Sequence, residues 1–233
     1  MVTALALWSA RSAADPHSPV VVLDPGHGGT NAGATGTTGL HEKQLTLAIA
    51  NAVATRLRDK NITVELTRSA DATLTLRQRV AAADRRAADL FVSIHANASP
   101  TRAQHGYETY VLTARGVDVD ARALRSDLTT PRPGVDADIG LVLDDVERGA
   151  SQWEAADLAA RMQRALRERR GSDGDRGVRQ DAHHVLLGAT MPAVLVEVGF
   201  IDHPIEGRQL VDPAVQAQLA DAIAEAISEQ LAD

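Results

Sequence analysis

Short apolar runs alternate with longer segments of helical periodicity along most of this 233-residue chain, and this alternation most constrains its fold. Val20–Asp24 (VVVLD) is a continuous apolar run that stops at Pro25-Gly26, as expected for a strand buried on both faces. Further strand-like runs cover 62–67, 90–95, 106–112 and 193–198, and helical segments cover 43–60, 74–88, 153–170 and the residues from Pro213 onward. This order predicts an α/β fold with a single mixed, mostly parallel sheet and helices on both faces.

The chain divides into a short N-terminal segment and one domain. Residues 1–14 (MVTALALWSARSAA) place an apolar stretch before small residues, as the tail of a secretory leader does, but lack its positively charged start. A poorly ordered terminus fits the same residues, and no apolar run approaches the roughly 20 residues of a membrane helix. We expect a leader-like or disordered segment over residues 1–19, one domain over residues 20–233 and no membrane span.

Composition excludes several kinds of function. With 24 basic and 31 acidic residues the formal net charge is −7, and the scattered basic residues predict no nucleic-acid surface. Aromatic residues make up 3% of the chain, too few for a base-stacking platform. Cysteine is absent, which excludes disulfides, Cys nucleophiles and thiolate metal sites. Any metal ion must therefore be held by His and carboxylate side chains.

Three motifs lie at the ends of predicted strands, where open α/β sheets place their sites. They are DPGHGG (24–29), SIHAN (93–97) and VEVGF (196–200). The first is rich in glycine but lacks the Lys-Ser/Thr pair of a P-loop and the third glycine of a dinucleotide fingerprint. No Gly-x-Ser-x-Gly elbow is present, which counts against a serine hydrolase.

His27 and His95 each follow an apolar strand, and Glu42 opens the first long helix. Together they offer two imidazoles and one carboxylate, which is the ligand set of a catalytic zinc site that keeps a fourth position for water. Because these residues are dispersed along the chain, their spacing is a weak signal, and two structural histidines remain the alternative. His41 adjoins Glu42 and could replace it as a ligand, although adjacent residues rarely converge on one ion.

Glu197 interrupts the apolar run AVLVEV (193–198), where a buried carboxylate is costly unless it is paired or belongs to a site. In a structural interpretation it reaches solvent or pairs with an arginine such as Arg179. In a functional interpretation it is the general base of a metal site, and its position at a strand end favours this second interpretation.

Taken together, these residues resemble the zinc-dependent N-acetylmuramoyl-L-alanine amidases of bacterial cell walls. The resemblance runs from Val20 to the C-terminus, which makes residues 20–233 an amidase catalytic domain. Its markers, in chain order, are LDPGHGG (23–29), Glu42-Lys43, LTR (66–68) with Asp71, LFVSIHAN (90–97), GYETYVL (106–112), DRGV (175–178) and MPAVLVEVGFIDH (191–203).

The resemblance implies one zinc ion held by His27, Glu42 and His95, with Glu197 as the catalytic glutamate. It implies hydrolysis, by metal-activated water and this general base, of the amide between the lactyl group of N-acetylmuramic acid and L-alanine. The substrate is then peptidoglycan or its released muropeptides, so we expect an extracytoplasmic protein, in the periplasm first and otherwise secreted or in the wall. We also expect a monomer, and a protein activator stays an open question.

Two segments depart from the family. Val185-Leu186-Leu187-Gly188 lacks an arginine that is common before the last strand, and the excursion at 115–138 is short for the helix that plugs the zinc site in some relatives. A zinc carboxypeptidase or related amidohydrolase, and a non-catalytic wall-binding module, are the competing functions. Glu197 argues against the second of these.

Overall fold

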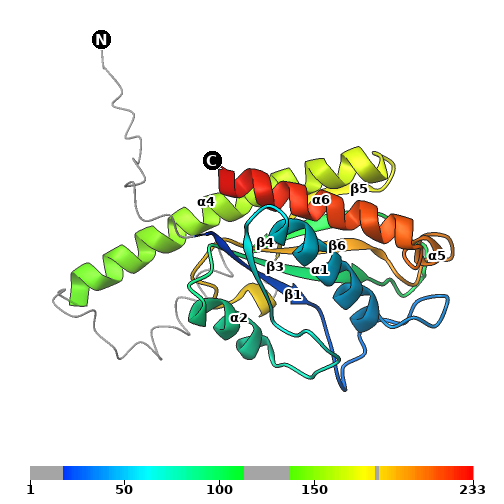
Figure 1. The fold of residues 1–233 in the computed structure, drawn as a ribbon, viewed down its shortest axis with the longest axis horizontal. Coiled ribbons are helices and arrows are strands. Elements are labelled where there is room, and N and C mark those ends of the chain that lie inside the picture. The colour runs from blue at the N-terminus through cyan, green and yellow to red at the C-terminus, as the bar shows by residue number, and fades with distance from the viewer. Residues whose placement is uncertain (1–17, 113–136, 182–183, 233) are drawn as a thin grey trace, which may run out of the picture.

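The computed structural model describes residues 18–112, 137–181 and 184–232, and these form one six-stranded sheet with helices on both faces (Figure 1). The strand order is β2-β1-β3-β6-β4-β5, and every neighbouring pair is parallel except β4 with β6. The mixed, mostly parallel sheet expected from the sequence is therefore confirmed. The strands are β1 (Val20–Pro25), β2 (Thr63–Leu66), β3 (Leu90–Asn97), β4 (Tyr107–Leu112), β5 (Asp175–Asp181) and β6 (Ala193–Phe200).

The two faces of the sheet are covered unequally. One face packs against α1 (Glu42–Arg58), α4 (Ala137–Arg170) and α6 (Pro213–Ala232), and this cluster holds most of the buried apolar side chains. The other face packs against α2 (Leu76–Arg85) and the short 3-10 helix η1 (His184–Leu186), on the opposite side of the sheet from α4 and α6 (Figure 1). α5 (Glu206–Gln209) follows β6. No helix in the described part of the chain could cross a bilayer.

The residues at the starts of α1 and α6 favour helix initiation. His41 and Gln44 form a capping box at the start of α1. Asp212 accepts a hydrogen bond from the Ala214 backbone N–H, and Pro213 opens α6, as the sequence predicts. These starts place α1 and α6 side by side over the central strands, where the apolar stripe of each helix is buried.

The parallel pairing of β1, β3 and β6 brings their carboxyl ends to one edge of the sheet. Pro25 is paired with Ile94, so Gly26 follows beside His95, and His95 is paired with Glu197. The loop after β1 returns to the same edge, because the Glu42 N–H donates to the Ala34 carbonyl at the start of α1. The register of three strands and one helix start thus places the candidate residues together.

The structure corrects two element predictions. The sequence predicts a loop over 171–177, whereas Asp175–Asp181 forms β5 at the edge of the sheet. A strand at the edge of a sheet does not need alternating apolar and polar residues. β5 is polar, contains Gly177 at φ +78 and pairs with β4 through a register shift. α4 begins at Ala137, before the predicted start at Trp153. Most of the predicted leader and of the 115–138 excursion lies outside the described residues.

Candidate metal centre

His27 lies in the Gly-rich loop after β1, with its backbone at φ +60. Its Nδ1 is 3.0 Å from Oδ1 of Asn31, and the Gly33 N–H donates to the same oxygen over 3.1 Å. Because that oxygen already accepts one hydrogen bond, Asn31 presents an acceptor, and Nδ1 of His27 carries the proton. The other ring nitrogen, Nε2, lies 3.0 Å from Oε2 of Glu42 and is the nitrogen left to bind a metal ion.

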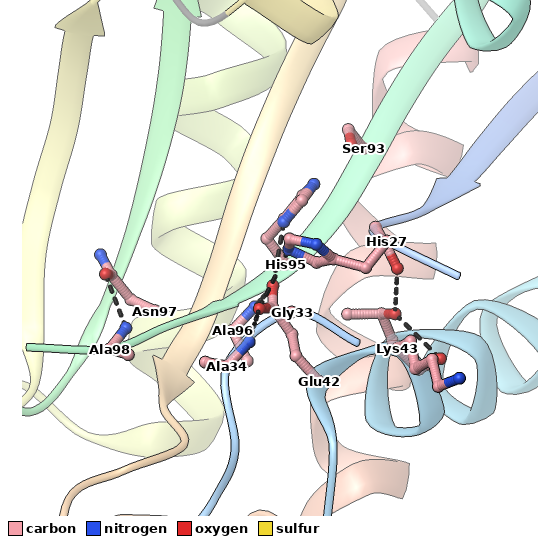
Figure 2. A network of polar contacts seen from close by, with 12 residues as sticks. His27, Gly33, Ala34, Glu42, Lys43, Ser93, His95, Ala96, Asn97 and Ala98 are labelled. Carbon is pink, nitrogen blue, oxygen red and sulfur yellow. Dashed lines mark hydrogen bonds and ion pairs between the residues drawn. The ribbon is translucent and has the colours of Figure 1, made fainter. Parts of the chain in front are cut away.

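Glu42 is the first residue of α1 and is buried between the two histidines (Figure 2). Oε1 lies 2.9 Å from Nδ1 of His95 and accepts from the Ala96 N–H, while Oε2 accepts from the Ala34 N–H. Burial raises the pKa of Glu42, but the hydrogen bonds with His27 and His95 outweigh it and hold that pKa far below its usual range. Glu42 is therefore a fixed anion between two imidazoles.

The ring of His95 projects from β3 and lies edge-on to that of His27, with 4.9 Å between ring centroids. The ring packs directly against the backbone of Gly26, where a Cβ would lie 2.6 Å from Nε2 of His95. On the other side of the site a Cβ at Gly33 would lie 2.5 Å from Oε2 of Glu42 and 2.7 Å from Cδ2 of His27. The glycines of this loop thus leave the room in which the three side chains meet.

Ligand atoms of His27, Glu42 and His95 all lie within 4.8 Å of one another. The structure therefore brings together the three residues that the sequence singled out. The hydrogen bond with Glu42 raises the pKa of His27, because the carboxylate stabilises the protonated imidazole. One divalent cation would satisfy the lone pairs of the three ligands, and a set of two imidazoles and one carboxylate suits zinc. The donor set fits the ion.

Glu197 lies in β6 directly beside His95, in register across the two strands. Its Oε2 is buried and has no hydrogen-bond partner among the described residues. Burial, together with the negative charges of Glu42 and Glu108, raises the pKa of Glu197 well above its usual value. The structural alternative, a pair with Arg179, is not formed: Nε of Arg179 lies 3.4 Å from Oε2 of Glu108 instead. A carboxyl group with one unpartnered oxygen beside the ligand His95 is suited to proton transfer.

His41, the alternative ligand, points elsewhere, since its Nδ1 is 3.1 Å from Oγ1 of Thr35. The sequence did not single out the residues that hold the loop in place. Arg79 on α2 donates to the carboxylate of Asp24 and to the carbonyls of Pro25 and His27. Arg68 donates to the carbonyls of Pro25 and Gly26. Both arginines are buried, and a buried arginine needs hydrogen-bond partners. These partners lie far from Arg68 and Arg79 in the sequence, so no local pattern indicates them.

Comparisons with known proteins agree along nearly the whole chain. A family model described as N-acetylmuramoyl-L-alanine amidase matches residues 21–229. The chain is 35% identical over 216 residues to the N-acetylmuramoyl-L-alanine amidase AmiA of Escherichia coli K12. This alignment covers 89% of this chain and 74% of that protein.

Two solved structures have the same fold. The catalytic domain of CwlV, an N-acetylmuramoyl-L-alanine amidase from Bacillus (Paenibacillus) polymyxa var. colistinus, is 33% identical with a TM-score of 0.70. The N-acetylmuramoyl-L-alanine amidase AmiC2 of Nostoc punctiforme is 30% identical with a TM-score of 0.71. Each comparison covers 92% of this chain and 98% of the solved one.

Proposed function

Because the chain belongs to the N-acetylmuramoyl-L-alanine amidase family, we propose a function from this membership and the geometry of its site. The protein is a hydrolase that cleaves the amide between the lactyl group of N-acetylmuramic acid and the L-alanine of the peptidoglycan stem. One observation carries the proposal: ligand atoms of His27, Glu42 and His95 lie within 4.8 Å of one another, beside Glu197, whose buried Oε2 has no hydrogen-bond partner among the described residues.

His27, Glu42 and His95 would hold one zinc ion. When bound, zinc supplies a Lewis acid that polarises the scissile carbonyl and makes water a stronger nucleophile. The chain supports this ligand set through the second contacts of each ligand. Asn31 keeps the proton of His27 on Nδ1, and the N–H groups of Ala34 and Ala96 orient the two oxygens of Glu42.

Glu197 would move the proton. Its carboxylate takes a proton from the attacking water, and the resulting carboxylic acid gives that proton to the nitrogen of L-alanine as the C–N bond breaks. The amine cannot leave without this proton. Burial and two neighbouring carboxylates raise the pKa of Glu197, which favours an acid able to hold the proton between the two transfers.

The location and the partners of the protein follow from its substrate. Peptidoglycan lies outside the cytoplasmic membrane, so we propose an extracytoplasmic site of action, with the periplasm as the first compartment to test. We propose that the protein acts as a monomer on polymeric wall or released muropeptides.

Product analysis tests this function. We expect digestion of purified sacculi to release intact stem peptides from the glycan, as detected by mass spectrometry, and chelator to stop the release until zinc is restored. Shortened stem peptides would instead identify a carboxypeptidase, the main competing enzyme. Absence of any release from labelled sacculi would favour a non-catalytic wall-binding module.

A variant separates the proton-transfer role from metal binding. Glu197→Gln removes the base but keeps the shape of the side chain, so we expect turnover to fall by about 10²–10⁴-fold. Elemental analysis should find the same zinc content as in the wild type. His95→Ala is the matched comparison, because it should lower the zinc content as well. Near-normal turnover of Glu197→Gln would show that another group transfers the proton.

A further inference from the structure

The row of polar side chains that contains His95 and Glu197 continues across two more strands. Glu108 on β4 is paired with Glu197 in the antiparallel register, and paired residues project from the same face of a sheet. β5 follows at the edge, where Arg179 is paired with Tyr110, two residues after Glu108. His95, Glu197, Glu108 and the arginines of β5 therefore lie side by side on one face.

Glu108 is a buried carboxylate that holds two guanidinium groups. Nε of Arg176 donates to Oε2 of Glu108 over 3.0 Å, and Nε of Arg179 lies 3.4 Å from the same oxygen. Oε1 accepts from Nδ2 of Asn97 over 3.0 Å. The Glu108 side chain is only 2% exposed, so its charge is committed to these contacts.

The two arginines are held differently. Nη2 of Arg176 is 3.3 Å from Oε1 of Gln104, and its guanidinium lies 5.0 Å from the ring centroid of Phe200. The side chain of Arg179 is 49% exposed, and its terminal nitrogens have no partner among the described residues. A guanidinium group carries five N–H donors in a planar fork that matches a carboxylate, so an ion pair through Nε leaves donors of Arg179 for a second carboxylate.

This step rests on the proposed function: the role of Glu197 indicates on which side of it the stem peptide lies. The group that receives the proton is the nitrogen of the stem peptide, so this nitrogen must lie next to Glu197. On one side of Glu197 the row is occupied by His95 and the other ligands. On the other side lie Glu108 and the two arginines. A stem peptide that extends from Glu197 away from the ligands therefore passes Glu108 and the half-exposed side chain of Arg179.

We propose that Arg179 determines specificity by binding a carboxylate of the stem peptide close to the released L-alanine. The first candidate is the free α-carboxylate of the second stem residue, a D-glutamate joined through its side chain. Arg176 would support this contact by sharing Glu108 with Arg179. The enzyme would then distinguish stem peptides that carry this carboxylate from those in which it is amidated.

Two synthetic muropeptides test the proposal: they are identical except that the α-carboxyl group of the second stem residue is free in one and amidated in the other. We expect the wild type to cleave the free acid with a kcat/KM about 10-fold higher or more, as a lost charge-assisted contact implies. Arg179→Gln should lower kcat/KM for the free acid to the value of the amide and leave the amide within about twofold. Because the contact is remote from the bond that breaks, the loss should be in KM.

Arg164→Gln is the matched control, since Arg164 pairs with Glu229 between α4 and α6 on the opposite face of the sheet. It should keep the preference of the wild type, and both variants should keep the wild-type zinc content. Equal kcat/KM of the wild type on both muropeptides, or an equal loss on both in Arg179→Gln, would overturn the inference. Release of intact stem peptides from sacculi in the same preparation would show that the proposed function stands regardless.

Discussion

At the scale of single residues, the site depends on positions that carry no side chain. A Cβ at Gly33 would meet Oε2 of Glu42 and Cδ2 of His27, at a backbone φ of +68. We expect Gly33→Ala to displace two ligands and to weaken zinc binding by at least about 10-fold, the scale of outer-shell changes at metal sites. Competition with a chromophoric chelator measures this affinity.

Gly39 separates crowding from backbone strain. It lies in the same loop region at φ +83, but a Cβ there would have no neighbour within 4 Å. Gly39→Ala should therefore share the conformational cost of about 1–2 kcal/mol and keep the zinc affinity of the wild type. Equal affinities of the two variants would mean that the ligands do not need the space above Gly33.

Glu197 makes the metal-free protein sensitive to pH. Burial raises its pKa above the usual 4.5, with further contributions from the charges of Glu42 and Glu108. Between the two pKa values the folded state holds a proton that the unfolded chain has lost, so the free energy of unfolding falls as pH rises through this window. Glu197→Gln removes this titration, and we expect the metal-free variant to be more stable than the metal-free wild type at neutral pH.

Thermal unfolding in the presence of chelator checks this expectation. Each kcal/mol gained should raise Tm by about 2–4 °C for a chain of this size. Below the usual carboxyl pKa both states of the wild type are protonated, so the advantage of Glu197→Gln should shrink there. A constant difference in Tm across the whole pH range would show that titration of Glu197 is not its cause.

At the scale of elements, Arg79 joins α2 to the end of β1. It donates to the buried carboxylate of Asp24 and to the carbonyls of Pro25 and His27. Arg79→Ala leaves Asp24 as a buried charge without its cation, and we expect the free energy of unfolding to fall by about 3–5 kcal/mol. Urea denaturation measures this loss, and zinc affinity should fall with it because the His27 carbonyl is released.

A variant of a surface arginine is the control for the loss of stability expected in Arg79→Ala. Arg164 pairs with Glu229 across α4 and α6, where both side chains are substantially exposed. Arg164→Ala should cost less than about 1 kcal/mol, because water already solvates both charges. Comparable losses in the Arg79 and Arg164 variants would show that burial of the Asp24 pair adds nothing.

Elements could be predicted where burial leaves a pattern in the sequence. β1, β3 and β6 are central strands covered on both faces, so their continuous apolar runs identify them. β5 lies at the edge and is polar, so its pairing with β4 left no such pattern. The same limit applies to Arg68 and Arg79, whose burial depends on carbonyls of a loop distant in the chain.

At the scale of the whole molecule, one ion would join three elements. His27 follows β1, Glu42 begins α1 and His95 ends β3, so zinc would bind the folded chain and not the unfolded one. At a free zinc concentration about 1,000 times Kd, the expected stabilisation is about 4 kcal/mol. That corresponds to a rise in Tm of about 8–16 °C for a chain of this size.

Calorimetry with and without zinc measures this shift. His95→Ala should lose most of it, whereas His41→Ala should keep it, because His41 contacts Thr35 and not the site. Magnesium prefers oxygen ligands and octahedral geometry, so it should produce little shift at the same concentration. An unchanged shift in His95→Ala would place the stabilising ion somewhere other than these three residues.

The sequence by itself determined the order of most strands and helices and the residue types at their ends. Those features follow from local periodicity and from the chemistry of short motifs, and they were enough to single out His27, Glu42, His95 and Glu197. Only the tertiary structure decided which of these groups touch. Pairing of β3 with β6 places Glu197 beside His95. The register of β4 and β5 places Arg179 in an ion pair with Glu108 and not with Glu197. Contacts of this kind depend on strand order and register, which arise from packing between segments that are remote in the chain.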